Sequence, residues 1–352
     1  MRPTRCEPSS TPHATSAGLR HYDARVILAC DVGGTKTNVA LLEPAGSSLA
    51  IARFESFRSR DHATLDDILV AFAGGHALSL DAAGFGVAGP VIGGRAVTTN
   101  LPWEIDARRL AERLGLPAAS LLNDVEAHAW SVDRLAPTAL LTLQEGAPAD
   151  GTVAVIAAGT GIGFSALVGS GTSRVSMASE GGLLAFLRDR HGQVSVERVL
   201  SGPGLVNVYE FLREAGGGEE PPWLSAALRE GDPAAAISAA AMGGRSETCS
   251  RAVDLFLEAY GAEAGNWALR TLAAGGLYVG GGIARKLLGP AGGAPEAWRA
   301  RARETFLRGF HDKERMRSLL ESVPVRVILD ERAPLVGAAR FAIESATWQA
   351  AR

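Results

Sequence analysis

Arg25-Val26-Ile27-Leu28-Ala29-Cys30 runs directly into Asp31-Val32-Gly33-Gly34-Thr35-Lys36-Thr37-Asn38, and a second apolar run follows at residues 39–42. Apolar runs joined by a glycine turn are typical of a β-hairpin. The second half of the chain repeats this design, because the apolar residues 152–157 lead into Ala158-Gly159-Thr160-Gly161-Ile162-Gly163 and then into residues 164–168. Two such hairpins indicate an internally duplicated scaffold with a cleft between its halves.

The remaining patterns mix helices with strands and outline the domains. Strands are predicted at residues 83–87, 120–123, 277–283 and 325–329, and helices at 61–74, 103–114, 125–130, 247–274 and 335–346. The strand at 277–283 is expected to feed a glycine turn. Residues 1–24 are predicted to be a disordered extension, because Pro3, Pro8 and Pro12 interrupt any periodicity. A second domain is predicted to open near Leu135.

Composition excludes several classes of protein. A chain of 352 residues that is 47% hydrophobic is long enough for two domains with a sizeable core. No apolar run approaches the roughly 18 residues of a membrane helix. The 35 Lys and Arg against 38 Asp and Glu argue against a nucleic-acid binder. Cys6, Cys30 and Cys249 lack a CxxC spacing, which argues against zinc and disulfides and favours the cytoplasm.

The two glycine turns are candidate phosphate sites. Glycine lets the backbone N–H groups of Gly33 and Gly34 approach a phosphate closely, and Thr35 adds a hydroxyl donor. Asp31, at the strand end, can hold a Mg²⁺-bound water near the phosphates. No Walker A loop is present, and Gly159-Thr160-Gly161 precedes a strand rather than the helix of the dinucleotide fingerprint. The alternative is a pair of plain hairpin turns with glycines at positive φ.

Asn123 and Asp124 are candidates for catalysis and sugar binding. Asp124 stands at a strand end where a helix begins, so its carboxylate can accept a proton from a substrate hydroxyl. Two adjacent hydrogen-bonding side chains also suit a polyol, whose neighbouring hydroxyls need paired donors and acceptors. The alternative for Asp124 is a helix N-cap, a position where Asp and Asn are common.

Three further positions each allow two interpretations. Glu180 precedes Gly181-Gly182 in a stretch poor in charge, which suits a ligand contact. Glu197 precedes Arg198 and is explained equally well as a solvated helix charge or an ion pair. Gly280-Gly281-Gly282 lets the backbone pack against an adenine face or simply against a neighbouring helix.

Taken in order, these stretches resemble bacterial glucokinases of the type without the zinc-binding cysteine cluster, within the actin-like and hexokinase-like ATPase superfamily. The resemblance runs from Val26 to about Phe341. Its most specific parts are Asp31-Val32-Gly33-Gly34-Thr35, Leu122-Asn123-Asp124, residues 158–163, residues 195–205, Asn266 and Gly280-Gly281-Gly282-Ile283. It implies a two-domain α/β fold in which residues 25–134 plus 332–352 form a small domain and residues 135–331 a large one.

The resemblance also implies an activity and a set of roles. The chain is expected to phosphorylate glucose at the C6 hydroxyl with ATP and Mg²⁺, with Asp124 as catalytic base. The implied sugar-binding residues are Asn100, Asn123, Asp124, Glu180 and Glu197. The implied ATP-binding residues are Asp31, Val32, Gly33, Gly34, Thr35, Gly159, Thr160 and Gly281, with Asp31 also serving Mg²⁺. The family commonly dimerises, so a cytoplasmic homodimer that binds neither nucleic acid nor membrane is expected.

One departure from the family concerns the sugar site. In these glucokinases a histidine that contacts the sugar follows Glu-Gly-Gly, whereas Leu183-Leu184-Ala185-Phe186 follows Glu180-Gly181-Gly182 here. The segment that carries the histidine looks deleted. Two alternatives therefore stay open, namely a kinase for a different hexose and a non-catalytic or degenerate sugar-binding homologue. The phosphoryl donor, ATP or polyphosphate, is also open.

Overall fold

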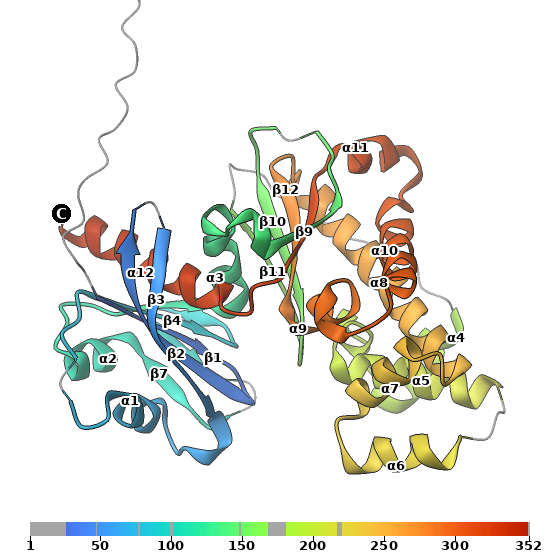
Figure 1. Ribbon diagram of the computed structural model, residues 1–352, viewed down its shortest axis with the longest axis horizontal. Coiled ribbons are helices and arrows are strands. Elements are labelled where there is room, and N and C mark those ends of the chain that lie inside the picture. Colours follow the sequence, from blue (N-terminus) through green and yellow to red (C-terminus); the bar gives the residue numbers. More distant parts are fainter. Residues whose placement is uncertain are drawn as a thin grey trace, which may run out of the picture.

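The computed structural model describes residues 26–46, 48–76, 78–98, 101–147, 149–167, 181–216 and 220–350, arranged as two lobes (Figure 1). Each lobe is built on a five-stranded sheet. The first sheet has the order β3 (Ser48–Arg58), β2 (Lys36–Ala45), β1 (Ile27–Val32), β4 (Ala82–Val87) and β8 (Ser120–Asn123). The second has the order β11 (Ile162–Leu167), β10 (Val153–Ala158), β12 (Gly276–Gly280), β13 (Val325–Ile328) and β9 (Leu140–Gln144).

The two sheets repeat one arrangement of strands. In the first, β1 pairs antiparallel with β2 and parallel with β4, which pairs parallel with β8. In the second, β10 pairs antiparallel with β11 and parallel with β12, which pairs parallel with β13. The predicted duplication is therefore confirmed at the level of strand order. Because parallel strands end at one sheet edge, the glycine turns and the ends of β8 and β12 lie where ligands bind in such folds.

Helices cover both sheets, and a small sheet flanks the first one (Figure 1). The small sheet consists of β5 (Val91–Ile92), β6 (Arg95–Val97) and β7 (Glu104–Asp106). The helices up to residue 242 are α1 (Leu65–Ala73), α2 (Ala107–Leu114), α3 (Asp124–Ser131), α4 (Gly181–His191), α5 (Gly202–Gly216), α6 (Pro222–Glu230) and α7 (Pro233–Met242). The later helices are α8 (Glu247–Thr271), α9 (Gly281–Leu287), α10 (Glu296–His311), α11 (Arg317–Ser322) and α12 (Ala333–Ala350).

The C-terminal helix α12 returns to the first sheet. Its buried residues Leu335, Ala338 and Ala342 pack in one cluster with Ile27 of β1 and Ala127 of α3. The two ends of the described chain thus lie in the same lobe (Figure 1). The division into domains at residues 134 and 331 stays a prediction.

Helix α3 joins the lobes, because it packs on the second sheet as well as on α12. Val125 and Ala129 of α3 share a buried cluster with Val155 of β10 and Tyr278 of β12. The approach is close at Gly163, where a Cβ atom would lie 2.2 Å from Val125 Cγ2. The contact between the lobes is therefore made one residue away from Asp124.

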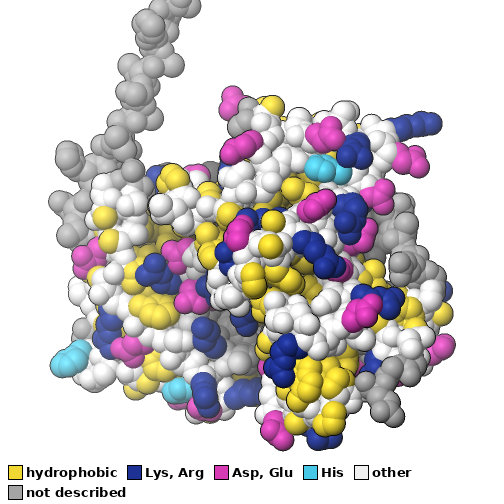
Figure 2. All heavy atoms as spheres, turned by 45° about the vertical axis from the view of Figure 1, so that its right-hand side comes forward, with side chains coloured by type: hydrophobic (Ala, Val, Ile, Leu, Met, Phe, Trp, Pro, Cys, Tyr) yellow, Lys and Arg dark blue, Asp and Glu magenta, His cyan; other side chains and the backbone are white. Residues whose placement is uncertain are grey.

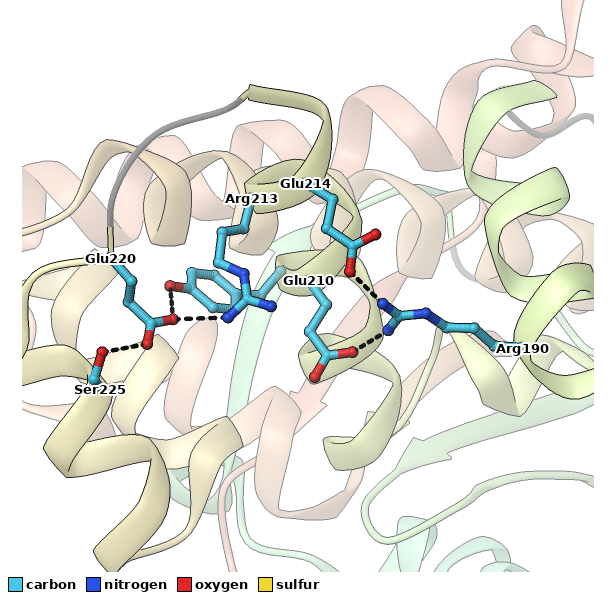
Figure 3. Close-up of polar contacts among 7 residues, drawn as sticks. Arg190, Glu210, Arg213, Glu214, Glu220 and Ser225 are labelled. Carbon is cyan, nitrogen blue, oxygen red and sulfur yellow. Dashed lines mark hydrogen bonds and ion pairs between the residues drawn. The ribbon is translucent and has the colours of Figure 1, made fainter.

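Two polar networks tie the helices of the second lobe together (Figure 3). Glu220, just before α6, accepts hydrogen bonds from the Tyr209 hydroxyl at 2.7 Å and from Arg213 Nη1 at 3.3 Å, both on α5. Arg190 of α4 pairs with Glu210 and Glu214 of α5. Tyr209 is buried and Glu220 has limited exposure, so this first network is more stabilising than exposed ion pairs usually are. It fixes α5, which forms part of the site described below.

The surface carries charges of both signs. Figure 2 shows Lys and Arg side chains interspersed with Asp and Glu over the face it draws. Among the residues that the structure describes, no helix has both the length and the apolar character needed to cross a membrane.

Several predicted helices and strands have different boundaries in the structure. The helix predicted at 103–114 is β7 followed by α2, because Asp106 caps α2 by accepting hydrogen bonds from the backbone N–H groups of Arg108 and Arg109. The helix predicted at 61–74 begins only at Leu65, because Thr64 and Asp67 form a capping box. The strand predicted at 277–283 ends at Gly280, where α9 begins. The patterns also missed β3, β9, α6, α7 and α10. The predicted extension, residues 1–24, lies outside the described residues.

Candidate active site

A polar cavity of about 240 Å³ lies where the two lobes meet. Its wall combines residues of β1, β2 and α3 with residues of α9 and of the segment between β13 and α12. They are Asp31, Lys36, Asn38, Asp124, His128, Gly281, Gly282, Arg285, Ile328, Asp330, Glu331 and Pro334. The structure thus brings together Asp31, Asp124 and Gly281, which the sequence predicted as site residues from distant parts of the chain.

Asp31 is held in this cavity by its cross-strand partner. Asn38 faces it in the β1–β2 register, and Asn38 Nδ2 donates to Asp31 Oδ2 at 3.2 Å. Ser56 of β3 in turn donates to Asn38 Oδ1 at 2.9 Å. Burial, followed by the negative charge of Asp124, raises the pKa of Asp31 to about 6. Two carboxylates that repel each other in a buried cavity favour a cation between or beside them.

Asp124 is the first residue of α3, and Asn123 is its N-cap. Asn123 Oδ1 accepts from the backbone N–H of Val125 at 3.0 Å, and Asn123 Nδ2 donates to the carbonyl of Gly89 at 3.0 Å. The N-cap interpretation therefore applies to Asn123 and not to Asp124. The Asp124 carboxylate accepts from the same Val125 N–H at 2.9 Å, and burial raises its pKa above the ordinary carboxyl value.

Hydrogen bonds to β3's end brace the first glycine turn. Ser59 Oγ donates to the carbonyl of Gly33 at 2.7 Å, and the Ser59 backbone N–H donates to the carbonyl of Thr35 at 3.1 Å. Neither Gly33 nor Gly34 has a positive φ. The positive φ that the hairpin-turn alternative assumed is therefore absent at these two glycines, while the choice between a plain turn and a phosphate site stays a prediction.

The second turn is anchored to the start of α5. The Gly202 N–H donates to the carbonyl of Gly159 at 2.9 Å, and the Gly159 N–H donates to the carbonyl of Gly161 at 2.7 Å. Gly159 and Gly161 likewise lack a positive φ. A Cβ atom on Gly161 would lie 2.4 Å from Glu197 Oε1, so the exposed Glu197 side chain reaches this turn. The predicted sugar residues Asn100 and Glu180 lie outside the described residues.

A larger cavity of about 840 Å³ adjoins the second turn. It is lined mainly by aliphatic and small side chains of α5, α7 and α9, including Leu205, Val206, Ala234 and Ile283. Gly282 lines both the large and the small cavity. The two cavities therefore adjoin at Gly282.

Comparisons with known proteins agree with this geometry. The glucokinase family model matches residues 28–345. A glucokinase from Nostoc sp. is 39% identical over 344 residues, covering 89% of this chain and 98% of the relative. The chain belongs to the glucokinase family. Members of this family phosphorylate glucose with ATP. A further member, a glucokinase from Salmonella arizonae, is 30% identical over 321 residues, covering 87% of this chain and 94% of the relative.

Solved structures confirm the predicted two-domain, actin-like and hexokinase-like fold of this glucokinase family member. A glucokinase from an Antarctic psychrotroph has a TM-score of 0.71 and 26% identity, with 91% of this chain and 99% of the other covered. A Streptomyces griseus ROK family glucokinase, solved with glucose and AMPPNP, has a TM-score of 0.59 at 23% identity, with 91% and 99% covered. The second comparison supports the fold alone.

The departure predicted at the family histidine has a structural counterpart. Leu183, which follows Gly181-Gly182, is 6% exposed and packs in the core of the second lobe. Helix α4 begins at Gly181, so the chain turns into the core directly after the two glycines. His191, at the end of α4, lines the large cavity instead.

Sequence reasoning missed several residues of the small cavity. The sequence patterns did not single out His128, yet it lines the cavity and its Nδ1 is buried without a hydrogen-bond partner among the described residues. Burial lowers its pKa to about 4. The spacing of four residues from Asp124 to His128, which puts both on one helix face, is the signal that would have found it. Arg285 was missed as well.

Proposed function

We propose that this chain transfers the terminal phosphoryl group of ATP to the C6 hydroxyl of glucose, with Asp124 as general base. The observation that carries the proposal is the pair of adjoining cavities. Asp31 and Asp124 line the small cavity, and Gly282 lines both this cavity and a neighbouring one large enough for a nucleoside. A purely polyphosphate donor would leave the large aliphatic cavity without a role, so ATP is the favoured donor.

Nucleotide binding is assigned to both glycine turns and to the start of α9. The adenosine occupies the large cavity beside Gly281 and Gly282, and the phosphates extend toward Asp31. The phosphates are assigned to the turns at Gly33-Gly34-Thr35 and Gly159-Thr160. Gly34, Thr35 and Thr160 supply the backbone N–H groups, because those of Gly33 and Gly159 already donate to the carbonyls of Lys36 and Gly161. Gly159 suits a phosphate-binding turn, because a Cβ atom there would meet no other atom within 4 Å, which indicates open space beside the turn.

Proton transfer is assigned to Asp124. The Asp124 carboxylate takes the proton of the C6 hydroxyl as the bond between O6 and the γ-phosphorus forms. The bond from that phosphorus to the ADP oxygen breaks at the same time, and ADP leaves with the electron pair. Burial raises the pKa of Asp124 and so makes its carboxylate a stronger base than an exposed one.

Asp31 is the residue assigned to Mg²⁺. Its carboxylate is the hard oxygen ligand that Mg²⁺ prefers, and the repulsion between Asp31 and Asp124 is what a cation would relieve. Among the described residues, no group of three or more His, Cys, Asp or Glu forms a metal cluster. That fits Mg²⁺, which commonly binds through one or two carboxylates and the substrate phosphates. When bound, the ion neutralises charge on those phosphates.

Sugar binding is assigned to Asn123, Asp124 and Glu197, together with Asn100 and Glu180. The Asn123 amide already accepts a hydrogen bond from the Val125 N–H and donates one to the Gly89 carbonyl. A hydrogen bond from Asn123 to a sugar must therefore use the same amide atoms. A second candidate function, phosphorylation of a hexose other than glucose, is favoured by Leu183. An apolar core residue there supplies no hydrogen bond to the sugar.

The experiment is ADP release from Mg²⁺-ATP with glucose, mannose, fructose, N-acetylglucosamine or no sugar. Glucose as the substrate with the highest kcat/KM supports the proposal. A higher kcat/KM with another hexose supports the second candidate. A folded protein that binds ATP but releases ADP with none of these sugars contradicts both candidates and favours a non-catalytic homologue.

A further inference from the structure

Arg285 has an unusual environment for an arginine in an ion pair. It lies on α9, and its Nη1 donates to Glu331 Oε2 at 2.9 Å. Its Nε is buried and has no hydrogen-bond partner within the described parts of the chain. A buried N–H without an acceptor destabilises the folded protein. Such a group is therefore a sign of an acceptor that the protein alone does not supply.

The free edge of the guanidinium matches a phosphate. Arginine carries two parallel N–H donors on the edge formed by Nε and Nη2, and this fork binds two oxygens of one phosphate. Glu331 uses Nη1, which lies on the other side of the group. The ion pair therefore orients Arg285, while no described residue accepts a hydrogen bond from the Nε–Nη2 edge.

Arg285 lines the small cavity, and the charges around that cavity indicate which ligand would suit its guanidinium. Four acidic residues line the cavity, namely Asp31, Asp124, Asp330 and Glu331, against two cationic ones, Lys36 and Arg285. Asp330 is already paired with Arg332, at 3.1 Å between Oδ1 and Nε. A triphosphate that enters this cavity thus meets one cation from the first sheet and one from α9.

We propose that Arg285 is a catalytic residue that binds the transferred phosphoryl group through its Nε–Nη2 edge, with Glu331 as the positioning residue. This inference rests on the proposed function. As the phosphoryl group moves from ADP to the sugar oxygen, negative charge spreads over its peripheral oxygens, and a fixed guanidinium stabilises that charge. Because Lys36 belongs to β2 of the first lobe and Arg285 to α9 of the second, the group would be held by a cation from each side of the cavity.

The test compares Arg285→Gln and Arg285→Lys with wild type in binding and turnover. We expect Arg285→Gln to weaken AMPPNP binding about 10- to 150-fold, the equivalent of a charge-assisted hydrogen bond. AMP, which lacks the terminal phosphates, should bind within threefold of wild type. We expect kcat to fall about 10²- to 10³-fold with the KM for glucose unchanged. Arg285→Lys keeps the positive charge but loses the pair of parallel N–H donors. Its AMPPNP affinity and kcat should lie between those of wild type and Arg285→Gln.

Two controls separate catalysis from folding. Arg317→Gln removes an arginine whose Nε pairs with Glu321 at the same 2.9 Å but outside both cavities, and it should leave kcat unchanged. Added guanidinium ion should restore part of the kcat of Arg285→Ala, which loss of structure alone would not allow. For Glu331→Gln we expect a smaller fall in kcat than for Arg285→Gln, with AMP binding unchanged.

Failure of this inference is distinguishable from failure of the proposed function. Equal ratios of AMPPNP to AMP affinity in wild type, Arg285→Gln and Arg285→Lys would overturn it, whatever the turnover. If Arg285→Gln does not fold, Arg285→Lys with wild-type kcat and AMPPNP affinity overturns it equally. A wild-type chain that phosphorylates no sugar contradicts the proposed function, whereas loss of AMPPNP binding in Arg285→Gln would still place the guanidinium on the terminal phosphate.

Discussion

The two cavities of this chain adjoin each other but differ in how many charged residues line them. Six of the twelve residues around the small cavity are Asp, Glu, Lys or Arg, whereas only three of the twenty-one around the large cavity are. Gly282 belongs to both. Under the proposed function, this difference separates nucleotide recognition, which needs apolar area, from phosphoryl transfer, which needs fixed charges in a confined space. Changes in the small cavity should therefore lower kcat, whether or not they also weaken nucleotide binding, whereas changes in the large cavity should act on the KM for ATP.

The largest effect is expected from Asp124→Asn. The variant keeps the size of the side chain but removes the base, so kcat should fall about 10²- to 10⁴-fold. Binding of glucose and AMPPNP should stay within threefold of wild type. Asp66→Asn, which alters a carboxylate on α1 paired with Arg113, is the matched control and should leave kcat unchanged. A kcat for Asp124→Asn near the wild-type value would exclude Asp124 as the base.

Gly282→Leu should distinguish the roles of the two cavities, because it should affect ATP binding but not glucose binding. A Cβ atom at Gly282 meets nothing within 4 Å, so a larger side chain fits the fold but occupies the passage that the nucleotide uses. The KM for ATP should rise roughly tenfold or more, because overpacking costs about 1–3 kcal/mol. The KM for glucose should not change, and Gly282→Ala should be near wild type. An unchanged KM for ATP in Gly282→Leu would mean that the nucleotide does not pass Gly282.

Gly163→Ala tests the contact that places Asp124 against the second lobe. Because a Cβ atom at Gly163 would lie 2.2 Å from Val125 Cγ2, the variant should lose about 1–3 kcal/mol of unfolding free energy. Adding Val125→Ala removes the clashing methyl groups and should recover part of the loss. Denaturant unfolding of both single variants and the double variant measures this coupling. Strictly additive effects would contradict the close contact.

The smallest effect concerns the pH dependence of stability. Burial lowers the pKa of His128 to about 4 from an ordinary value of 6.5, so the unfolded chain binds more protons between these values. Stability from the neutral ring is present above pH 6.5 and lost as pH falls toward 4. His128→Gln should therefore lose less unfolding free energy than wild type as pH falls over this range, as measured by denaturant unfolding at several pH values. The exposed His76→Gln is the control, and parallel curves for wild type and His128→Gln would refute the prediction.

Local signals made part of the site predictable from sequence. Asp31 and Asp124 follow apolar strands, and glycine clusters mark both turns, so the residue order alone places the strand ends and the turns. The N-cap of α3 was harder to predict. Asn and Asp are both good N-caps, so the sequence did not decide between Asn123 and its neighbour Asp124. The resemblance to glucokinases then supplied the roles.

Long-range packing made the rest unpredictable. Arg285 reaches the small cavity only because α9 follows β12, which pairs with β10 rather than with a neighbour in sequence. The helix predicted at 103–114 failed for a local reason, since Asp106 forms a cap that ends the strand before the apolar spacing of α2 begins. The burial of Leu183 was also unpredictable from local patterns, because it depends on packing against helices α5 to α8 of the second lobe.

The most direct test of the adjoining-cavity mechanism is a crystal structure of this chain with glucose and AMPPNP. The predicted result is adenine in the large cavity, the triphosphate passing Gly282, and the terminal phosphate in the small cavity beside Asp31. Glucose O6 should lie within about 3 Å of an Asp124 carboxylate oxygen, the reach of a general base. A terminal phosphate outside the small cavity, or a glucose O6 beyond hydrogen-bonding distance of Asp124, would contradict the mechanism.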